Sequence, residues 1–277
     1  MKKRLFFVGA ACWMVLAVLT ASCDMQRGTG AQPEGIHYVK SVSYVSSFWG
    51  EPFETEVVFH YDSIWRLSRV DVREKDVAET GTTISYAWRD AGLTVTCDYG
   101  DRYPYTCDFS LDGSGRVTSL KTTSEDGSEV RRDYTYGAEG LARIQSDAGL
   151  HVGNIEWRDG NIVSADAVLS LGGEEGSDTG DAFACTYGTY DNDYSIDING
   201  LLVYGWWDCL WPAEIVLPRF VGMGCDKLLS SFRVESFGTG TSTMSVTYET
   251  DSAGRIVRIT TKDDDGDSAS YSFTYYE

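Results

Sequence analysis

The chain has 277 residues, of which 42 are acidic and 23 basic, so its net charge is −19. A protein this anionic is repelled by nucleic acid and by an anionic membrane face, which argues against both as binding partners. Solubility is the simplest explanation of the charge.

The first 22 residues have the composition of an export signal. Three basic residues at positions 2–4 precede an apolar run that ends at residue 20 and is short for a membrane span. Ala21 and Ser22 then lead into Cys23, a pattern that resembles a bacterial lipobox, in which the cysteine is lipidated and becomes the first mature residue. We predict a signal peptide at residues 1–22 and lipidation of Cys23. An ordinary secretory signal with a nearby cysteine is the alternative.

A flexible tether is predicted at residues 23–35, which are polar and contain glycines and Pro33. Loss of the three basic residues of the signal leaves 20 basic against 42 acidic residues, a net charge of −22. No later segment is long and apolar enough to cross a bilayer as a helix. We therefore expect the lipid on Cys23 to anchor the protein in the cell envelope, at the outer membrane, without assigning the leaflet.

Residues 36–277 have the pattern of a single β domain. Residues 39–45 and 54–61 alternate apolar with polar side chains, as half-buried strands do. The clearest repeat spans residues 248–259: alternation leads to Asp251, three residues reach Gly254, and alternation then resumes. This is typical of a β-hairpin whose short loop ends on a glycine with positive φ.

Further copies of this hairpin pattern occur at residues 61–67, where Trp65 replaces the glycine, and at 88–93, 111–117, 136–141 and 157–162. The loop glycines at 92, 115, 140 and 160 are 23, 25 and 20 residues apart, a period that indicates a recurring unit of two strands and two turns. Return turns at 125–127, 172–176 and 263–267 complete the series. The sequence therefore predicts an antiparallel meander, with neighbours in sequence paired in space.

About a dozen such strands fit into the domain, and open sheets rarely exceed about ten strands without curling or closing. We predict an all-β fold: one large antiparallel meander sheet, strongly curled or barrel-like, whose concave side is too broad for its own side chains to fill. The long break in the period, at about residues 189–237, is predicted to fill it. Pro212 suits a helix start and Gly222 or Gly224 its end, so we expect one or two short apolar helices there, with a surface excursion as the alternative.

Five cysteines remain after the signal and Cys23 are set aside, so they cannot all pair within one chain. Cys97 and Cys107 flank a turn and are candidates for a disulfide across a hairpin. Two free buried thiols are the alternative.

These features together resemble Bacteroidetes envelope lipoproteins that carry a domain of unknown function with a porin-like fold. The resemblance rests on the lipoprotein signal, the repeated Tyr-x-Tyr-Asp-x-x-Gly-Arg hairpins and the late interruption. Within the interruption, the matching residues are Asp197, Asn199, Gly200, Leu201, Leu202, Gly222, Gly224, Lys227, Leu228, Ser230 and Ser231. The resemblance implies a porin-like fold and an envelope location, and it implies no catalytic residue.

The sequence contains no pattern that indicates catalysis. It has neither a Gly-x-Ser-x-Gly elbow nor a phosphate-binding loop, and its three histidines, His37, His60 and His151, lack zinc-ligand spacing. The acidic residues at 191–200 hint at a calcium loop, but the register that places Gly200 sixth puts Trp206 at the last ligand position. We predict no enzyme activity, no cofactor and no metal.

Binding is the better prediction. Trp206, Trp207, Trp211 and Tyr204 are candidates for a stacking platform that holds sugar rings, and the alternative is that they fill the curled sheet. We predict a lipid-anchored binding or scaffold module whose partner, beyond the membrane itself, is a glycan or another envelope protein. A glycan-binding protein of a polysaccharide-uptake system, a transmembrane β-barrel and an unrecognised hydrolase are the alternatives.

Overall fold

The alternating segments of the sequence form strands whose two faces differ in burial. The computed structural model describes residues 32–46, 53–74, 81–98, 104–169, 179–203, 224–236 and 240–277. In β8 (Glu129–Tyr136), Arg131, Asp133 and Thr135 are exposed while Arg132 and Tyr134 are buried. This period of two places every second side chain of a strand on the same face of the sheet.

The described residues form sixteen strands and one short helix, α2 (Ile198–Val203). The remaining strands are β1 (Val39–Ser46), β2 (Phe53–Tyr61), β3 (Leu67–Glu74), β4 (Thr82–Arg89), β5 (Gly92–Asp98), β6 (Tyr105–Leu111), β7 (Val117–Ser124), β9 (Leu141–Ser146), β10 (Leu150–Arg158), β11 (Asn161–Leu169), β12 (Thr179–Asp191), β13 (Lys227–Ser236), β14 (Gly240–Thr250), β15 (Ile256–Lys262) and β16 (Ser268–Tyr275).

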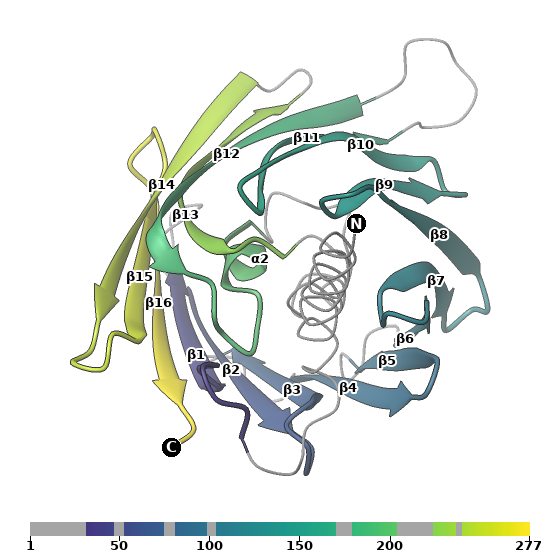
Figure 1. Cartoon of the computed structure of the whole chain (residues 1–277), viewed down its shortest axis with the longest axis horizontal. Coiled ribbons are helices and arrows are strands. Elements are labelled where there is room, and N and C mark those ends of the chain that lie inside the picture. The colour runs from purple at the N-terminus through teal and green to yellow at the C-terminus, as the bar shows by residue number, and fades with distance from the viewer. Residues whose placement is uncertain are drawn as a thin grey trace, which may run out of the picture.

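These strands close into a barrel (Figure 1). Each strand pairs antiparallel with its neighbours in sequence, and β1 pairs with β16, with Val42 opposite Phe273, to complete the ring. The predicted all-β meander is confirmed. The expected dozen strands is too few, because turns such as the one between Arg89 and Gly92 use less chain than the estimate assumed.

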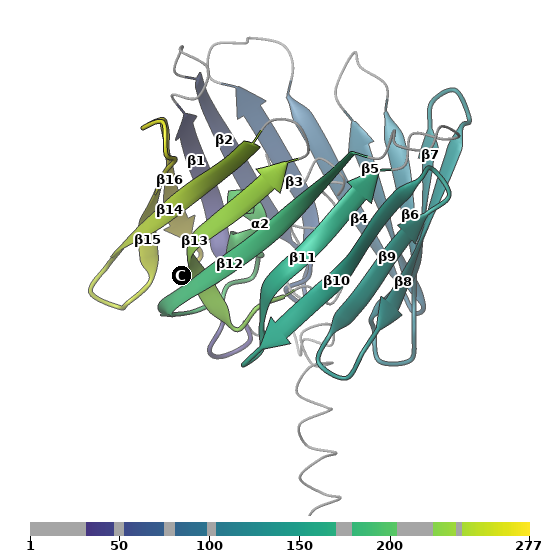
Figure 2. The ribbon, with the colours of Figure 1, turned by 90° about the horizontal axis from the view of Figure 1, so that it is seen from above.

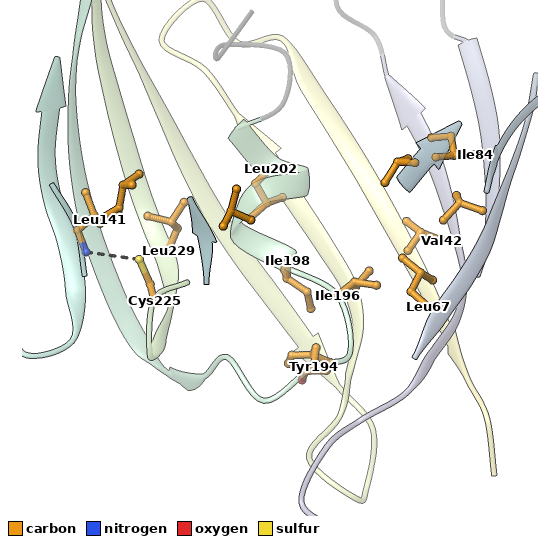
Figure 3. Close-up of a cluster of buried hydrophobic side chains, with 14 of the residues drawn as sticks. Val42, Leu67, Ile84, Leu141, Tyr194, Ile196, Ile198, Leu202, Cys225 and Leu229 are labelled. Atoms are coloured by element: carbon orange, nitrogen blue, oxygen red, sulfur yellow. Dashed lines mark hydrogen bonds between the residues drawn. The ribbon is translucent and has the colours of Figure 1, made fainter. Parts of the chain in front are cut away.

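The apolar face of the wall points into the barrel. Val42, Ile84 and Leu141 of the wall belong to the same buried cluster as Ile198 and Leu202 of α2, which lies inside the ring (Figures 1 and 3). The outward face therefore carries the exposed side chains. In the described residues, no helix is long and apolar enough to span a membrane.

Several repeats of the sequence form hairpin loops that are closed by hydrogen bonds between an aspartate and the arginine four residues later, which we call the Asp–Arg clasp. Asp112 Oδ1 accepts hydrogen bonds from the backbone N–H groups of Ser114 (2.9 Å) and Arg116 (3.0 Å), and Oδ2 accepts one from Arg116 Nε (3.0 Å). The Arg116 guanidinium carbon lies 4.7 Å from the centre of the Tyr136 ring, and the Tyr136 hydroxyl donates to the Val117 carbonyl (2.7 Å). The loop is thus fastened to the next strand, β8.

The same clasp joins Asp62 and Arg66 to Trp88, and Asp251 and Arg255 to Tyr275. In each case the aromatic residue that covers the clasp arginine lies 20 to 22 residues further along the chain, on the strand that follows the hairpin. Trp65 occupies the position of the loop glycine with a φ of 62°. It packs 4.8 Å, ring centre to ring centre, from Tyr38, where the start of β1 meets the end of β16.

The clasp hairpins, the start of β1 and the end of β16 all lie at one end of the barrel, which we call the plug end (Figure 2). The return turns at residues 125–127 and 263–267 lie at the far end, and the return turn predicted at residues 172–176 lies outside the described residues. The segment between β12 and β13 enters at the plug end, and we call its described parts, residues 192–203 and 224–226, the plug. The predicted insertion is thus too long, because residues 189–191 belong to β12 and residues 227–236 to β13. The helix predicted at Pro212 lies outside the described residues.

Candidate functional site

Five of the residues predicted to be lipidated or to bind a ligand lie outside the described part of the chain. These are the lipidation site and the stacking platform: Cys23, Tyr204, Trp206, Trp207 and Trp211. Their roles stay predictions.

Cys97 and Cys107 are described, and both are buried thiols outside any disulfide. The register of β5 and β6 pairs Cys97 with Tyr105 and Val95 with Cys107, so the two cysteines are diagonal neighbours. Diagonal positions have Cα atoms about 7–8 Å apart, beyond the span that a disulfide bridges. The disulfide considered from the sequence is therefore not formed.

The acidic and amide residues of the plug have structural partners. Asp197 Oδ1 accepts a hydrogen bond from the Gly200 N–H (3.1 Å) and so caps α2. Asn199 bridges to the wall, donating to the Lys227 carbonyl (2.8 Å) and accepting from the Leu229 N–H (2.9 Å). Of the residues that hinted at a calcium loop, Asp197 thus caps α2 and Asn199 fixes the plug to β13.

The other side of the plug is joined to the start of β1. The backbone of His37 bonds to both Asp193 (2.9 Å) and Ser195 (3.1 Å). The Ser195 hydroxyl accepts from the Val39 N–H (3.0 Å) and lies 2.7 Å from the Tyr61 hydroxyl. The plug is therefore held on two sides of the ring, and Ile196 and Ile198 lie inside it (Figure 3).

The inner wall also carries polar groups among its apolar side chains. Tyr86 on β4 is 5% exposed, and within the described part of the chain its hydroxyl has no hydrogen-bond partner. Burial raises the pKa of Tyr86, and the nearby thiols of Cys97 and Cys107 raise it further. The hydroxyl therefore stays protonated at physiological pH and is a buried donor directed into the barrel.

Arg132 on β8 is a buried cation on the same inner wall, 7% exposed and paired in register with Leu120 and Ser146. Buried hydroxyl residues lie toward the far end of other strands: Ser46, Thr122, Ser146 and Thr261. Sequence reasoning missed Tyr86 and Arg132. The alternation of β8 contains the signal for Arg132, because it shares its parity with the inward Tyr134.

The inner-wall thiol of Cys97 is poorly suited to covalent chemistry. Burial raises the pKa of Cys97 to about 11, with a hydrogen bond from Tyr105 opposing the rise, so this thiol is poorly nucleophilic at neutral pH. Among the described residues, no three His, Cys, Asp or Glu side chains converge on a position that would hold a metal ion. Donor groups on an otherwise apolar wall are what a pocket for a small molecule provides.

Comparisons with known proteins agree with this architecture. No family model matches the chain, and no curated protein matches it in sequence. A porin-like protein from Bacteroides uniformis superposes with a TM-score of 0.63 at 14% identity, over 88% of this chain and 100% of that one. A porin-like protein from Bacteroides vulgatus superposes with a TM-score of 0.62 at 12% identity, over 87% and 99% of the two chains. The chain shares its fold with these porin-like proteins.

Proposed function

We propose that the protein is a lipid-anchored, non-catalytic binding module of the cell envelope, and that its barrel stands in water beside the membrane. The observation that carries this proposal is the orientation of the wall. A barrel that spans a bilayer presents an apolar band to the lipid and polar residues to its interior. Here the apolar face is turned inward, toward α2.

Charged residues occupy the outward face at mid-strand. Arg131 and Asp133 on β8, Arg233 on β13, and Arg258 on β15 are all exposed. An arginine or lysine on the lipid face at the bilayer midplane costs about 2–4 kcal/mol. The wall therefore favours water over lipid as its surroundings, which leaves the predicted lipid on Cys23 as the attachment to the membrane.

The inner wall is the proposed binding surface. A sixteen-strand barrel is wider than the side chains of its own wall fill, and a purely structural core has no need of a buried donor such as Tyr86. The polar residues toward the far end give this surface the mixed character of a ligand site. The folds of the two porin-like proteins are compatible with an envelope role.

Replacing the predicted anchor tests the proposal. The Cys23→Ala protein, expressed in a bacterium that processes lipoproteins, should move from the membrane pellet to the detergent-free supernatant and remain folded. Cys12→Ala, within the predicted signal, is the matched control and should stay in the pellet. Retention of Cys23→Ala in the pellet until detergent is added would contradict both the anchor and the water-facing wall.

A further inference from the structure

We propose that Cys185 and Cys225 form a disulfide that ties the plug to the barrel wall. The proposal rests on the export of the chain contained in the proposed function, because disulfides form and persist in oxidising compartments outside the cytoplasm. Both cysteines are free thiols in the structure, and the proposal assigns a covalent link to a pair that the sequence alone did not identify.

The two sulfurs meet at one hydroxyl group. Cys225 lies in the plug, where its Sγ accepts a hydrogen bond from the Ile162 N–H (3.4 Å) and is 3.1 Å from the Tyr187 hydroxyl (Figure 3 shows the first bond). Cys185 lies on β12, two residues before Tyr187 and on the same face of the strand, and it also interacts with the Tyr187 hydroxyl. A wall cysteine and a plug cysteine therefore border the same oxygen atom.

The surroundings hold the plug sulfur in place. Tyr187 donates its hydroxyl hydrogen to the Ile162 carbonyl (2.6 Å), which fixes the ring between β11 and β12. The Cys225 carbonyl accepts from the Asn192 side chain (3.1 Å), and Asn161 accepts from the Lys227 N–H (2.8 Å). Cys225 is thus bonded within the plug through Asn192, and the chain that follows it is bonded to the start of β11 through Asn161.

The other two cysteines of the described residues do not compete for this role. Cys97 and Cys107 lie within one sheet, and their diagonal register keeps their Cα atoms too far apart for a bridge. Cys185 and Cys225 instead come from two different parts of the fold that pack against each other. Cys209 lies outside the described residues and is removed in the experiment below.

The reaction is thiol–disulfide exchange with a small disulfide such as oxidised glutathione. One cysteine, as the thiolate, attacks the glutathione disulfide, which releases one glutathione thiol and leaves a mixed disulfide. The second cysteine then attacks the protein sulfur of that mixed disulfide and releases the second glutathione. The protein loses two hydrogen atoms, and one glutathione disulfide becomes two glutathione thiols.

The burial of the two thiols determines the stage of folding at which the disulfide forms. Burial raises the pKa of Cys185 to about 12 and that of Cys225 to about 11, so few thiolates exist in the folded protein at neutral pH. In the unfolded chain both thiols have ordinary acidity. We therefore expect the bond to form during folding and then to be protected from reduction.

Refolding the purified full chain in a glutathione redox buffer tests the proposal. In a Cys209→Ala background, tryptic mapping should find a peptide that links Cys185 to Cys225, with a mass about 2 Da below that of the two thiol peptides. The oxidised protein should unfold about 5–10 °C higher than the reduced protein. Cys185→Ala and Cys225→Ala, each made in the same background, should abolish the linked peptide and the shift.

A linked peptide between any other pair, no linked peptide, or a thermal shift that survives Cys185→Ala would overturn the proposal. Cys97→Ala is the matched control and should retain both the linked peptide and the shift. The oxidation is done on purified protein, so its failure is distinguishable from a failure of the anchoring experiment.

Discussion

Tyr86 is the inner-wall side chain that structural packing alone explains least well. Its ring is buried between apolar neighbours, and its hydroxyl lacks a hydrogen-bond partner within the described residues. A buried polar group without a partner costs about 1–3 kcal/mol. Such a cost is tolerated where the group serves a ligand or an ordered water molecule.

Tyr86→Phe should therefore leave the free energy of unfolding unchanged or raise it by about 1 kcal/mol in the absence of ligand. Tyr136→Phe is the contrasting variant, because it removes a hydroxyl that donates to the Val117 carbonyl, and it should lower that free energy by about 1 kcal/mol. Urea denaturation of both variants gives the comparison. Equal losses of stability in the two variants would show that the Tyr86 hydroxyl is already satisfied.

The alternation of inward and outward side chains along a strand is enough to predict some of the residues on the inner wall. Arg132 lies between Val130 and Tyr134 on the inward face, so an alternating pattern places it inside once the direction of the face is known. The sequence carries no such signal that the Tyr86 hydroxyl lacks a hydrogen-bond partner within the described residues, because this depends on how distant strands surround the hydroxyl. The same limit applies to the thiols: Cys97 and Cys107 flank a turn, and only the register shows that they are diagonal.

At the scale of elements, the Asp–Arg clasp makes the hairpins sensitive to pH. Burial alone would raise the pKa of Asp112, but hydrogen bonds from Ser114 and Arg116 outweigh it and lower the pKa to about 2. A carboxyl group whose pKa is lower in the folded state stabilises the fold above its unfolded pKa of about 4. That contribution is lost as the pH falls from about 4 through 2.

Wild-type protein should therefore lose more stability between pH 5 and pH 2 than the Asp112→Asn variant does. At neutral pH the Asp112→Asn variant should be the less stable of the two, because the substitution removes the charged acceptor. Thermal unfolding across this pH range measures the difference. Thr118→Ala changes no titratable group and should follow the wild-type curve. An Asp112→Asn curve parallel to that of the wild type would show that the clasp carboxylate makes no pH-dependent contribution.

The plug should depend on Asn199. Its amide makes two hydrogen bonds to β13, so Asn199→Ala leaves a buried carbonyl and a buried N–H without their partners. We expect a loss of about 2–3 kcal/mol in the free energy of unfolding, measured by urea denaturation. Thr118→Ala, exposed on the outer wall, serves again as the control. A loss below about 0.5 kcal/mol would mean that water replaces both bonds.

The hairpins were predictable because their signals are local. Asp251, Gly254 and Arg255 specify a loop within five residues, and the Gly254 φ of 82° agrees with the expected glycine conformation. The limits of the insertion were less predictable, because residues 227–236 contain no hairpin signal and are identified as a strand only by pairing with β12 and β14.

At the scale of the whole molecule, the proposed function depends on the closure of the barrel and on which face of its wall turns inward. The pairing of β1 with β16 joins residues from the two ends of the described chain, and no local pattern of the sequence encodes it. The strand count alone predicted a curled or closed sheet. Which face of that sheet turns inward separates a barrel in water from a barrel in lipid, and here the buried apolar cluster includes α2.

Chemical labelling of the outer wall in membranes tests this orientation most directly. Asp133 on β8 and Ser245 on β14 are exposed at mid-strand, and each is replaced by cysteine in the otherwise unchanged anchored protein. A water-soluble maleimide should label Asp133→Cys and Ser245→Cys rapidly in isolated, permeabilised membranes, and faster than it labels the unsubstituted protein, whose described thiols are buried or half-buried. Labelling of either variant only after detergent removes the lipid would contradict a water-facing wall.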